Sequence, residues 1–213
     1  MTEILTDAEE LLARLEKLDT RTRRLIAIAG APGSGKSTLV DHLSNRLCNK
    51  APGSAAVIPM DGYHLDDNVL STRGALARKG APHTFDVGGF TAMLKRLKEN
   101  NEDEIAVPVF DRKLEISRAG GRMISKDIPL LLVEGNYLLL DKPGWSDLRP
   151  LFDLTISLDV PFEELERRLL KRWLDHGFDE DRARTKALEN DMPNARLVIE
   201  SSFTADLLYR MKL

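Results

Sequence analysis

The chain has 213 residues, with 31 lysines and arginines, 34 aspartates and glutamates and a formal net charge of −3. Without a block of basic residues, this near balance lacks the charge pattern of a nucleic-acid-binding protein. No apolar stretch approaches the roughly 20 residues of a membrane span, and no secretory signal is recognisable. We therefore expect a cytoplasmic α/β domain, large enough for a small lid, with no nucleic-acid or membrane partner.

An amphipathic helix is expected over residues 1–23, ahead of a main domain over residues 24–213. Thr6 or Asp7 can cap this helix. One of its faces carries Leu11, Leu12, Leu15 and Leu18. Such a helix either packs on its own domain or forms a contact between copies of the chain, and we favour packing on the domain.

A phosphate-binding loop (P-loop) is the most specific motif of the chain. The pattern G-x-x-x-x-G-K-[ST] is fitted by Gly30, Ala31, Pro32, Gly33, Ser34, Gly35, Lys36, Ser37 and Thr38. A predicted strand over 25–29 precedes it and a predicted helix over 36–48 follows, so backbone N–H groups and a helix N-terminus can cradle a triphosphate. Lys36 supplies a catalytic positive charge for the β- and γ-phosphates, and the Ser37 hydroxyl can bind Mg²⁺.

Strands and helices alternate after this loop. Apolar runs predict strands over 55–60, 104–110, 130–133, 154–158 and 205–209. Capping residues and apolar spacing predict helices from residue 86, over 161–173, over 179–190 and from residue 194. Residues 65–85 are expected to form an irregular, partly helical excursion, and residues 113–128 a weak hairpin or loop around Gly120 and Gly121.

This alternation predicts a three-layer α/β fold of the P-loop NTPase kind, with a mostly parallel central sheet and a helical lid over about 161–190. In a parallel sheet, the carboxyl ends of the strands share one edge. The P-loop, Asp61, Asp111 and Glu134 each follow the end of a predicted strand. We therefore expect them to gather around the γ-phosphate of a bound nucleotide.

Two of these acidic residues are candidates for chemistry. Glu134 can hold Mg²⁺ opposite Ser37, directly or through a water, although acidic residues are also common at strand ends without a function. Asp61 can accept the proton of a hydroxyl that attacks the γ-phosphate, or can simply form an Asp-Gly turn. The predicted metal site is thus Ser37 with Glu134, and the predicted base is Asp61.

Arg168 and Arg172 lie four residues apart and therefore share one face of the predicted lid helix. They can neutralise charge on the transferring phosphoryl group, or they form a solvated face on which Glu164 pairs with Arg168. The candidate groups for an acceptor site are more dispersed along the chain: Tyr63, His64, His83, Asp111, Arg112 and Tyr137.

Five ordered motifs carry a resemblance to known kinases. They are the P-loop, Met60-Asp61-Gly62-Tyr63, Arg78-Lys79-Gly80-Ala81-Pro82-His83-Thr84-Phe85-Asp86, Pro108-Val109-Phe110 and Glu134-Gly135-Asn136-Tyr137. In this order they resemble the uridine kinase, phosphoribulokinase and bacterial pantothenate kinase superfamily over nearly the whole chain after the N-terminal helix. The chain is most similar to a small bacterial set labelled nucleoside/nucleotide kinase-like or fructose-transport-system kinase, through Trp145, Arg168-Leu169-x-x-Arg172 and Asp191-x-x-Asn194-Ala195.

The resemblance implies an ATP-dependent, Mg²⁺-requiring kinase that acts on a hydroxyl of a small metabolite. By position it makes Asp61 the catalytic base and Glu134 the metal-associated acid. It makes Arg168 and Arg172 lid arginines and places Asn194 near the purine. A sugar such as fructose is the leading acceptor, and a homodimer is compatible with the family.

Two alternatives remain open at this stage. The first is a pantothenate- or nucleoside-type acceptor, although the chain lacks the Arg-Gly-Arg lid signature of uridine kinases and has Asp111-Arg112 in place of their Tyr-Asp. The second is a nucleotide-hydrolysing regulatory module that binds a protein partner. Neither an Asn-Lys-x-Asp guanine motif nor a Leu-Ser-Gly-Gly-Gln transporter signature is present.

Overall fold

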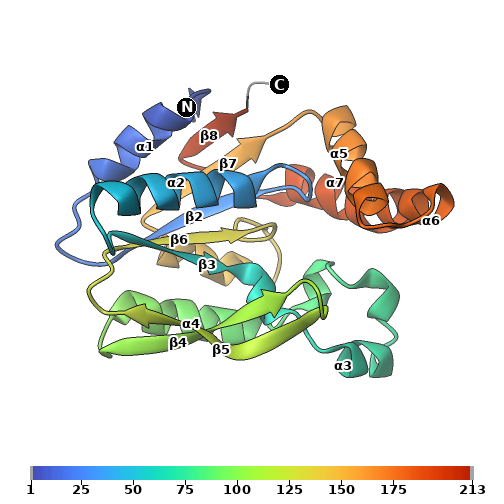
Figure 1. The fold of residues 1–213 in the computed structure, drawn as a ribbon, viewed down its shortest axis with the longest axis horizontal. Helices are drawn as coiled ribbons and strands as arrows, with labels where there is room; N and C mark the ends of the chain where they lie inside the picture. Colours follow the sequence, from blue (N-terminus) through green and yellow to red (C-terminus); the bar gives the residue numbers. More distant parts are fainter. Residues whose placement is uncertain (1, 212–213) are drawn as a thin grey trace.

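Six parallel strands form the central sheet of the computed structural model, which describes residues 2–211 (Figure 1). Every neighbouring pair is parallel. In spatial order the strands are β1 (Glu3–Leu5), β8 (Leu207–Arg210), β7 (Leu154–Asp159), β2 (Arg24–Gly30), β6 (Leu130–Gly135) and β3 (Ala55–Pro59). The predicted α/β fold with a mostly parallel sheet is confirmed.

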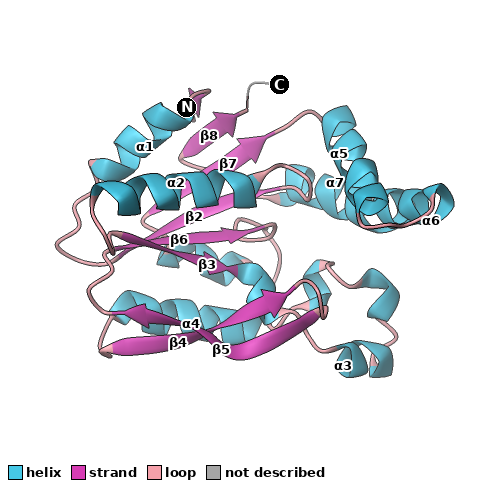
Figure 2. Cartoon of the chain, viewed as in Figure 1, coloured by secondary structure: helices cyan, strands magenta, loops and turns pink. Residues whose placement is uncertain are grey.

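Helices cover both faces of this sheet (Figure 2). Since successive residues of a strand point to opposite faces, each central strand contributes side chains to two cores. On β2, Ile26 and Ile28 pack beneath α1 (Ala8–Glu16) and α2 (Lys36–Lys50). Leu25, Ala27 and Ala29 face the opposite core. That core is closed by α4 (Val87–Glu99), η4 (Ser146–Leu151) and α7 (Met192–Ser201).

The N-terminal segment is more closely joined to the domain than a single helix over 1–23 would be. Strand β1 pairs with β8 at the edge of the sheet, and helix α1 covers only Ala8–Glu16. The Asp7 side chain accepts a hydrogen bond from the Glu9 N–H and begins the helix. Leu11 and Leu15 are fully buried against the core beneath α2, so packing on the domain is confirmed.

Strand β4 (Glu104–Asp111) does not join the central sheet, so the prediction that Asp111 lies on its carboxyl edge is wrong. It pairs antiparallel with β5 (Ile116–Ser125) to form a separate hairpin. The turn of this hairpin lies between Asp111 and Ile116 rather than around Gly120 and Gly121. Gly121 instead lies inside β5, where a Cβ atom would come within 2.3 Å of Val109 Cγ2.

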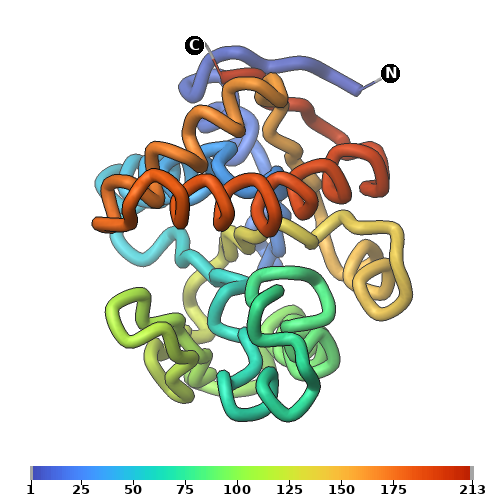
Figure 3. Tube along the Cα trace, turned by 90° about the vertical axis from the view of Figure 1, so that its right-hand side faces the viewer, coloured from blue at the N-terminus to red at the C-terminus, as the bar shows by residue number. Residues whose placement is uncertain are grey.

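Two segments stand at the carboxyl end of the sheet, one above the other in Figure 3. The excursion after β3 contains η1 (Met60–Tyr63), α3 (Asp67–Thr72), η2 (Leu76–Arg78) and η3 (Pro82–Thr84). It is therefore partly helical, as expected. The lid contains α5 (Phe162–Asp175), α6 (Glu180–Thr185) and the π-helical turn η5 (Lys186–Asp191). Within residues 2–211, no helix is long and apolar enough to cross a membrane.

The second lid helix is continuous where two helices were predicted. Helix α6 passes through η5 directly into α7, without the break that was expected between residues 190 and 194. Pro193 follows the π turn directly, and its missing N–H removes one regular hydrogen bond from this continuous helix.

Candidate active site

The P-loop connects β2 to α2 with the geometry of an anion cradle. Gly33 and Gly35 have φ angles of 80° and 88°, in the left-handed region that residues with a Cβ atom rarely adopt. Helix α2 begins at Lys36, so its N-terminal N–H groups face the same loop. The Lys36 Nζ atom donates to Asn136 Oδ1 at 2.5 Å and to the Ala31 carbonyl at 3.3 Å, which holds its charge at the mouth of the cradle.

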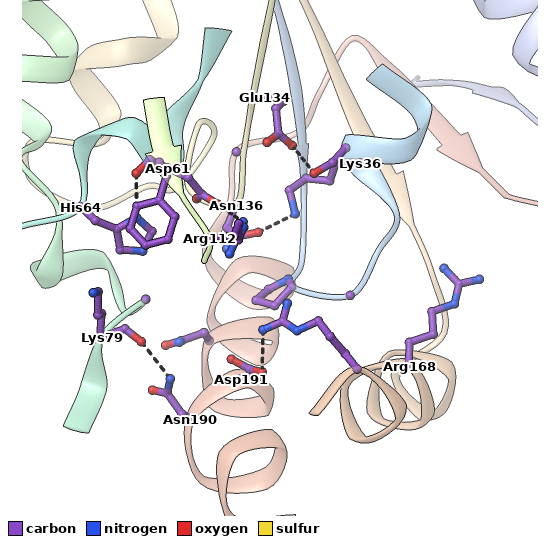
Figure 4. Close-up of a pocket in the computed structure, with 18 of the residues that line it drawn as sticks. Lys36, Asp61, His64, Lys79, Arg112, Glu134, Asn136, Arg168, Asn190 and Asp191 are labelled. Atoms are coloured by element: carbon purple, nitrogen blue, oxygen red, sulfur yellow. Dashed lines mark hydrogen bonds and ion pairs between the residues drawn. The ribbon is translucent and has the colours of Figure 1, made fainter. Parts of the chain in front are cut away.

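Ser37 and Glu134 form the oxygen pair that was predicted as a metal site. Strand β6 lies beside β2 with Glu134 opposite Ile28, and the Ser37 hydroxyl donates to Glu134 Oε2 at 3.1 Å (Figure 4). Within residues 2–211 no cluster of three or more His, Cys, Asp or Glu side chains is suited to a metal. One hydroxyl and one carboxylate fit Mg²⁺, which keeps several waters and takes phosphate oxygens as further ligands.

The two charged groups at the P-loop lie in a dry environment. Burial lowers the pKa of the Lys36 ammonium, against the opposing influence of Glu134 and Asp61. Burial likewise raises the pKa of the Glu134 carboxyl, against the influence of Lys36. Since desolvation penalises the charged form of each group, an added anion favours the charged form of Lys36, whereas an added cation favours the charged form of Glu134.

Asp61 stands next to this site because β3 lies beside β6, with Pro59 opposite Glu134. Its carboxylate forms an ion pair with Arg112, which extends from the turn of the β4–β5 hairpin. The Asp61 carbonyl lies 2.8 Å from His64 Nδ1. Figure 4 shows Asp61 and His64 on one side of the pocket, Lys36 with Glu134 on the other, and Arg112 between them.

These groups line one cavity of about 430 Å³ between the P-loop, the excursion, the hairpin turn and the lid. The hairpin and excursion contribute His64, Lys79, Phe110 and Arg112. The rings of Phe85 and Phe110 lie 4.1 and 4.6 Å from the His64 ring, centroid to centroid. This burial lowers the pKa of the His64 imidazole, although the nearby Asp61 carboxylate opposes the shift.

The lid arginines line the cavity, and Arg168 also forms the ion pair with Glu164 that was considered for it. Arg168 Nε donates to Glu164 Oε1 at 2.6 Å, and its Nη1 lies 3.4 Å from the Ser34 carbonyl of the P-loop. Arg172 forms an ion pair with Asp191 at 3.3 Å. Burial raises the pKa of the Asp191 carboxyl, although the charge of Arg172 opposes the shift. Both arginines line the cavity, as does Asn194.

Four of the candidate acceptor-site residues do not line this cavity. The Tyr63 side chain is buried against Phe90, and the Tyr137 hydroxyl donates to the Gly80 carbonyl at 2.6 Å inside the core. His83 is exposed on η3. The Asp111 carboxylate accepts hydrogen bonds from two backbone N–H groups of the hairpin turn.

The cavity is also lined by residues that the sequence patterns did not single out as site residues. Asn136 holds Lys36 and directly follows Glu134 and Gly135, so its place at a strand end was the available signal. Asn190 and Asp191 come from the π turn of the lid. Their helix period gave no sign of this orientation, because a π turn shifts the side chains that follow it around the helix axis.

Comparisons with known proteins place this geometry in a family. Residues 25–209 match the model of the "Phosphoribulokinase / Uridine kinase family". A "Putative uridine kinase" of Schizosaccharomyces pombe is 35% identical over 209 residues, covering 94% of this chain and 88% of that protein. The crystal structure of a "putative fructose transport system kinase" from Silicibacter sp. TM1040 is 44% identical, with a TM-score of 0.89, and the match covers 96% of this chain and 100% of that one.

A more distant structure supports the fold alone. A "putative P-loop containing kinase with a circular permutation" from Saccharomyces cerevisiae is 20% identical, with a TM-score of 0.82, over 98% of this chain and 100% of that one. The motif, the matched residues and the kinase names of these relatives agree. The chain belongs to the phosphoribulokinase/uridine kinase family and is an ATP-dependent P-loop kinase.

Proposed function

We propose that this kinase transfers the γ-phosphate of ATP, in the presence of Mg²⁺, to a hydroxyl of an uncharged sugar or related polyol, with fructose as the leading acceptor. The observation that carries the proposal is the uneven distribution of charge in the cavity. One half of the cavity has a surplus of positive charge, which suits a triphosphate. The other half has no surplus charge, which suits a neutral molecule.

The half formed by the P-loop and lid has a surplus of two positive charges. Its charged side chains are Lys36, Arg168, Arg172 and Lys186 against Glu134 and Asp191. The half formed by the excursion and hairpin is balanced, with Lys79 and Arg112 against Asp61 and Glu115. Ion pairs occur in both halves, Arg112 with Asp61 and Lys79 with Asp67 in this one and Arg168 with Glu164 and Arg172 with Asp191 in the other, so the halves differ in the balance of the charges that line them.

A balanced half-site favours a neutral acceptor over an anionic one. A phosphate or carboxylate group there meets cations whose charge Asp61 and Asp67 already offset, so the net attraction for an anion is small. Hydroxyl groups need only hydrogen-bond partners, which Asp61 and His64 offer. The resemblance to a protein named for fructose transport agrees with this assignment, although that name describes the relative.

The side chains at the boundary of the two halves have complementary roles in this proposal. Lys36 and the P-loop N–H groups bind the β- and γ-phosphates, and Asp61 accepts the proton of the attacking hydroxyl. Arg168 and Arg172 neutralise charge on the transferring group and exclude water. Ser37 and Glu134 would hold Mg²⁺, which supplies additional neutralisation of phosphate charge when it is bound.

An acceptor panel tests the proposal directly. ATP consumption is measured with fructose, other unphosphorylated sugars and polyols, their phosphorylated counterparts, pantothenate and uridine, and the product is identified by mass spectrometry. We expect stimulation by an unphosphorylated sugar or polyol and weaker stimulation by its phosphorylated counterpart. Stimulation only by pantothenate or uridine would establish the alternative acceptor classes. Slow turnover that responds only to a protein partner would establish the regulatory module instead.

A further inference from the structure

Arg78 connects the excursion to the lid without lining the cavity itself. It is the last residue of η2, and its Nη1 donates to the Glu189 carbonyl at 2.6 Å. Its Nη2 donates to Asn194 Oδ1 at 3.1 Å. We call these two contacts the Arg78 bridge. The residues that follow, Lys79 and Gly80, do line the cavity, so the bridge ends directly at the acceptor half.

The lid offers Arg78 an acceptor because of a local feature of its helix. In a regular α-helix, the Glu189 carbonyl would accept from the N–H four residues later, but that residue is Pro193, which has no N–H. The π turn η5 ends at this point, and Met192 N–H donates five residues back to the Ala187 carbonyl. Arg78 therefore bonds a carbonyl that the helix cannot pair with its regular donor.

Two further hydrogen bonds are accepted by the backbone carbonyls of Lys79 and Gly80, which line the cavity. Asn190 Nδ2, from the same π turn, donates to the Lys79 carbonyl at 3.0 Å. The Tyr137 hydroxyl, from the loop after β6, donates to the Gly80 carbonyl at 2.6 Å. Residues 78–80 are thus joined by hydrogen bonds both to the lid and to the end of the central sheet.

We propose that Arg78 is a positioning residue that transmits nucleotide-induced ordering of the lid to the acceptor-binding excursion. The lid arginines face the donor half, so a bound nucleotide orders α5 and η5, and the bridge then orders residues 78–80 where the acceptor binds. Donor and acceptor occupancy are thereby coupled, and the coupling is reciprocal by linkage. This inference rests on the kinase activity of the proposed function but not on the identity of the acceptor.

Hydrogen–deuterium exchange with the non-hydrolysable ATP analogue AMP-PNP and Mg²⁺ tests the coupling without any acceptor. In the wild-type chain, we expect AMP-PNP to slow exchange in the P-loop, in residues 186–194 and also in residues 76–85. In Arg78→Ala, we expect protection of the P-loop to persist. The additional protection of residues 76–85 should fall by roughly tenfold or more, the size of losing a charge-assisted hydrogen bond.

Arg73→Ala is the matched control, because Arg73 lies in the same excursion, is exposed and forms no side-chain hydrogen bond within residues 2–211. It should retain the wild-type response. Arg78→Lys keeps the charge but not the planar two-pronged geometry, so we expect an intermediate response, and it carries the test if Arg78→Ala does not fold. A purely structural role would alter exchange equally with and without AMP-PNP.

Two results would overturn the inference. One is wild-type protection of residues 76–85 by AMP-PNP that survives in Arg78→Ala, and the other is the absence of such protection in the wild-type chain. A steady-state assay with fructose adds a second readout, since Arg78→Ala should raise KM for fructose more than it lowers kcat. If no compound of the acceptor panel is phosphorylated, the proposed function fails while the exchange result still decides the role of Arg78.

Discussion

Asp61→Asn separates chemistry from binding at the proposed acceptor site. The amide has nearly the shape of the carboxylate, whose side chain is 19% exposed, so the substitution leaves no cavity. It removes the only property that a general base needs, the ability to accept a proton from the attacking hydroxyl. The P-loop and Lys36 remain intact, so nucleotide binding is expected to be unchanged.

The expected loss in kcat is about 10²- to 10⁴-fold, the usual contribution of a positioned general base. This corresponds to about 3 to 5 kcal/mol of transition-state stabilisation. The ion pair with Arg112 contributes little of it, because the Arg112 side chain is 65% exposed and such pairs contribute only about 0 to 1 kcal/mol. The assay is ATP consumption with saturating acceptor, together with the Kd of AMP-PNP by calorimetry.

Arg112→Ala is the diagnostic comparison, because it breaks the same ion pair and keeps the carboxylate. We expect it to raise KM for the acceptor and to change kcat by less than about tenfold, since ground-state binding and not proton transfer is lost. Unchanged turnover in Asp61→Asn would refute the assignment of the base. Equal losses of kcat in both variants would show that the ion pair, rather than the carboxylate, is what matters.

Three further substitutions test the site and the fold. Lys36→Met should weaken AMP-PNP binding by about 10- to 100-fold in calorimetry, because a charge-assisted phosphate contact is lost. It should not lower stability to urea, because burial already penalises the ammonium. Burial lowers the pKa of His64 below 6.5, so the stabilisation from its neutral form is present above pH 6.5 and is lost as the pH falls through the folded-state pKa. In urea unfolding, His64→Gln should therefore lose less stability than the wild-type chain between pH 7.5 and pH 5. Arg23 is buried and donates to the carbonyls of Leu97, Ser125 and Ile128, so Arg23→Met should lower the free energy of unfolding by about 2 to 4 kcal/mol, whereas an unchanged urea midpoint would show that these carbonyls find other donors.

The donor half of the site was predictable because its signals are local. The P-loop has a fixed spacing, the strand before it is a continuous apolar run, and Glu134 follows the most apolar run in the chain. The pairing of β2 with β6 then brings Ser37 and Glu134 together. Each step depends on residues within a few positions of one another, or on the rule that parallel strands end at one edge.

The separate hairpin was not predictable by the same reasoning, because β4 has the pattern of a central strand and its partner β5 has no strand pattern. Strand β4 follows a helix and has buried apolar residues, as a strand of the central sheet would. Its actual partner β5 is exposed over most of its length and has arginines and glycines where an apolar alternation is expected. The hairpin nevertheless brings Arg112 to Asp61, so half of the acceptor site depends on a strand without an apolar pattern.

The lid shows why its cavity-facing residues also escaped prediction. Two separate helices were predicted here, one ending at residue 190 and one starting from residue 194, and Pro193 between them is a residue that commonly marks a helix boundary. The chain instead continues through a π turn, which places Asn190 and Asp191 at the cavity. The same proline leaves the Glu189 carbonyl to Arg78. One irregularity thus accounts for the missed side chains and for the contact that joins the lid to the acceptor half, which is where a kinase must coordinate its two substrates.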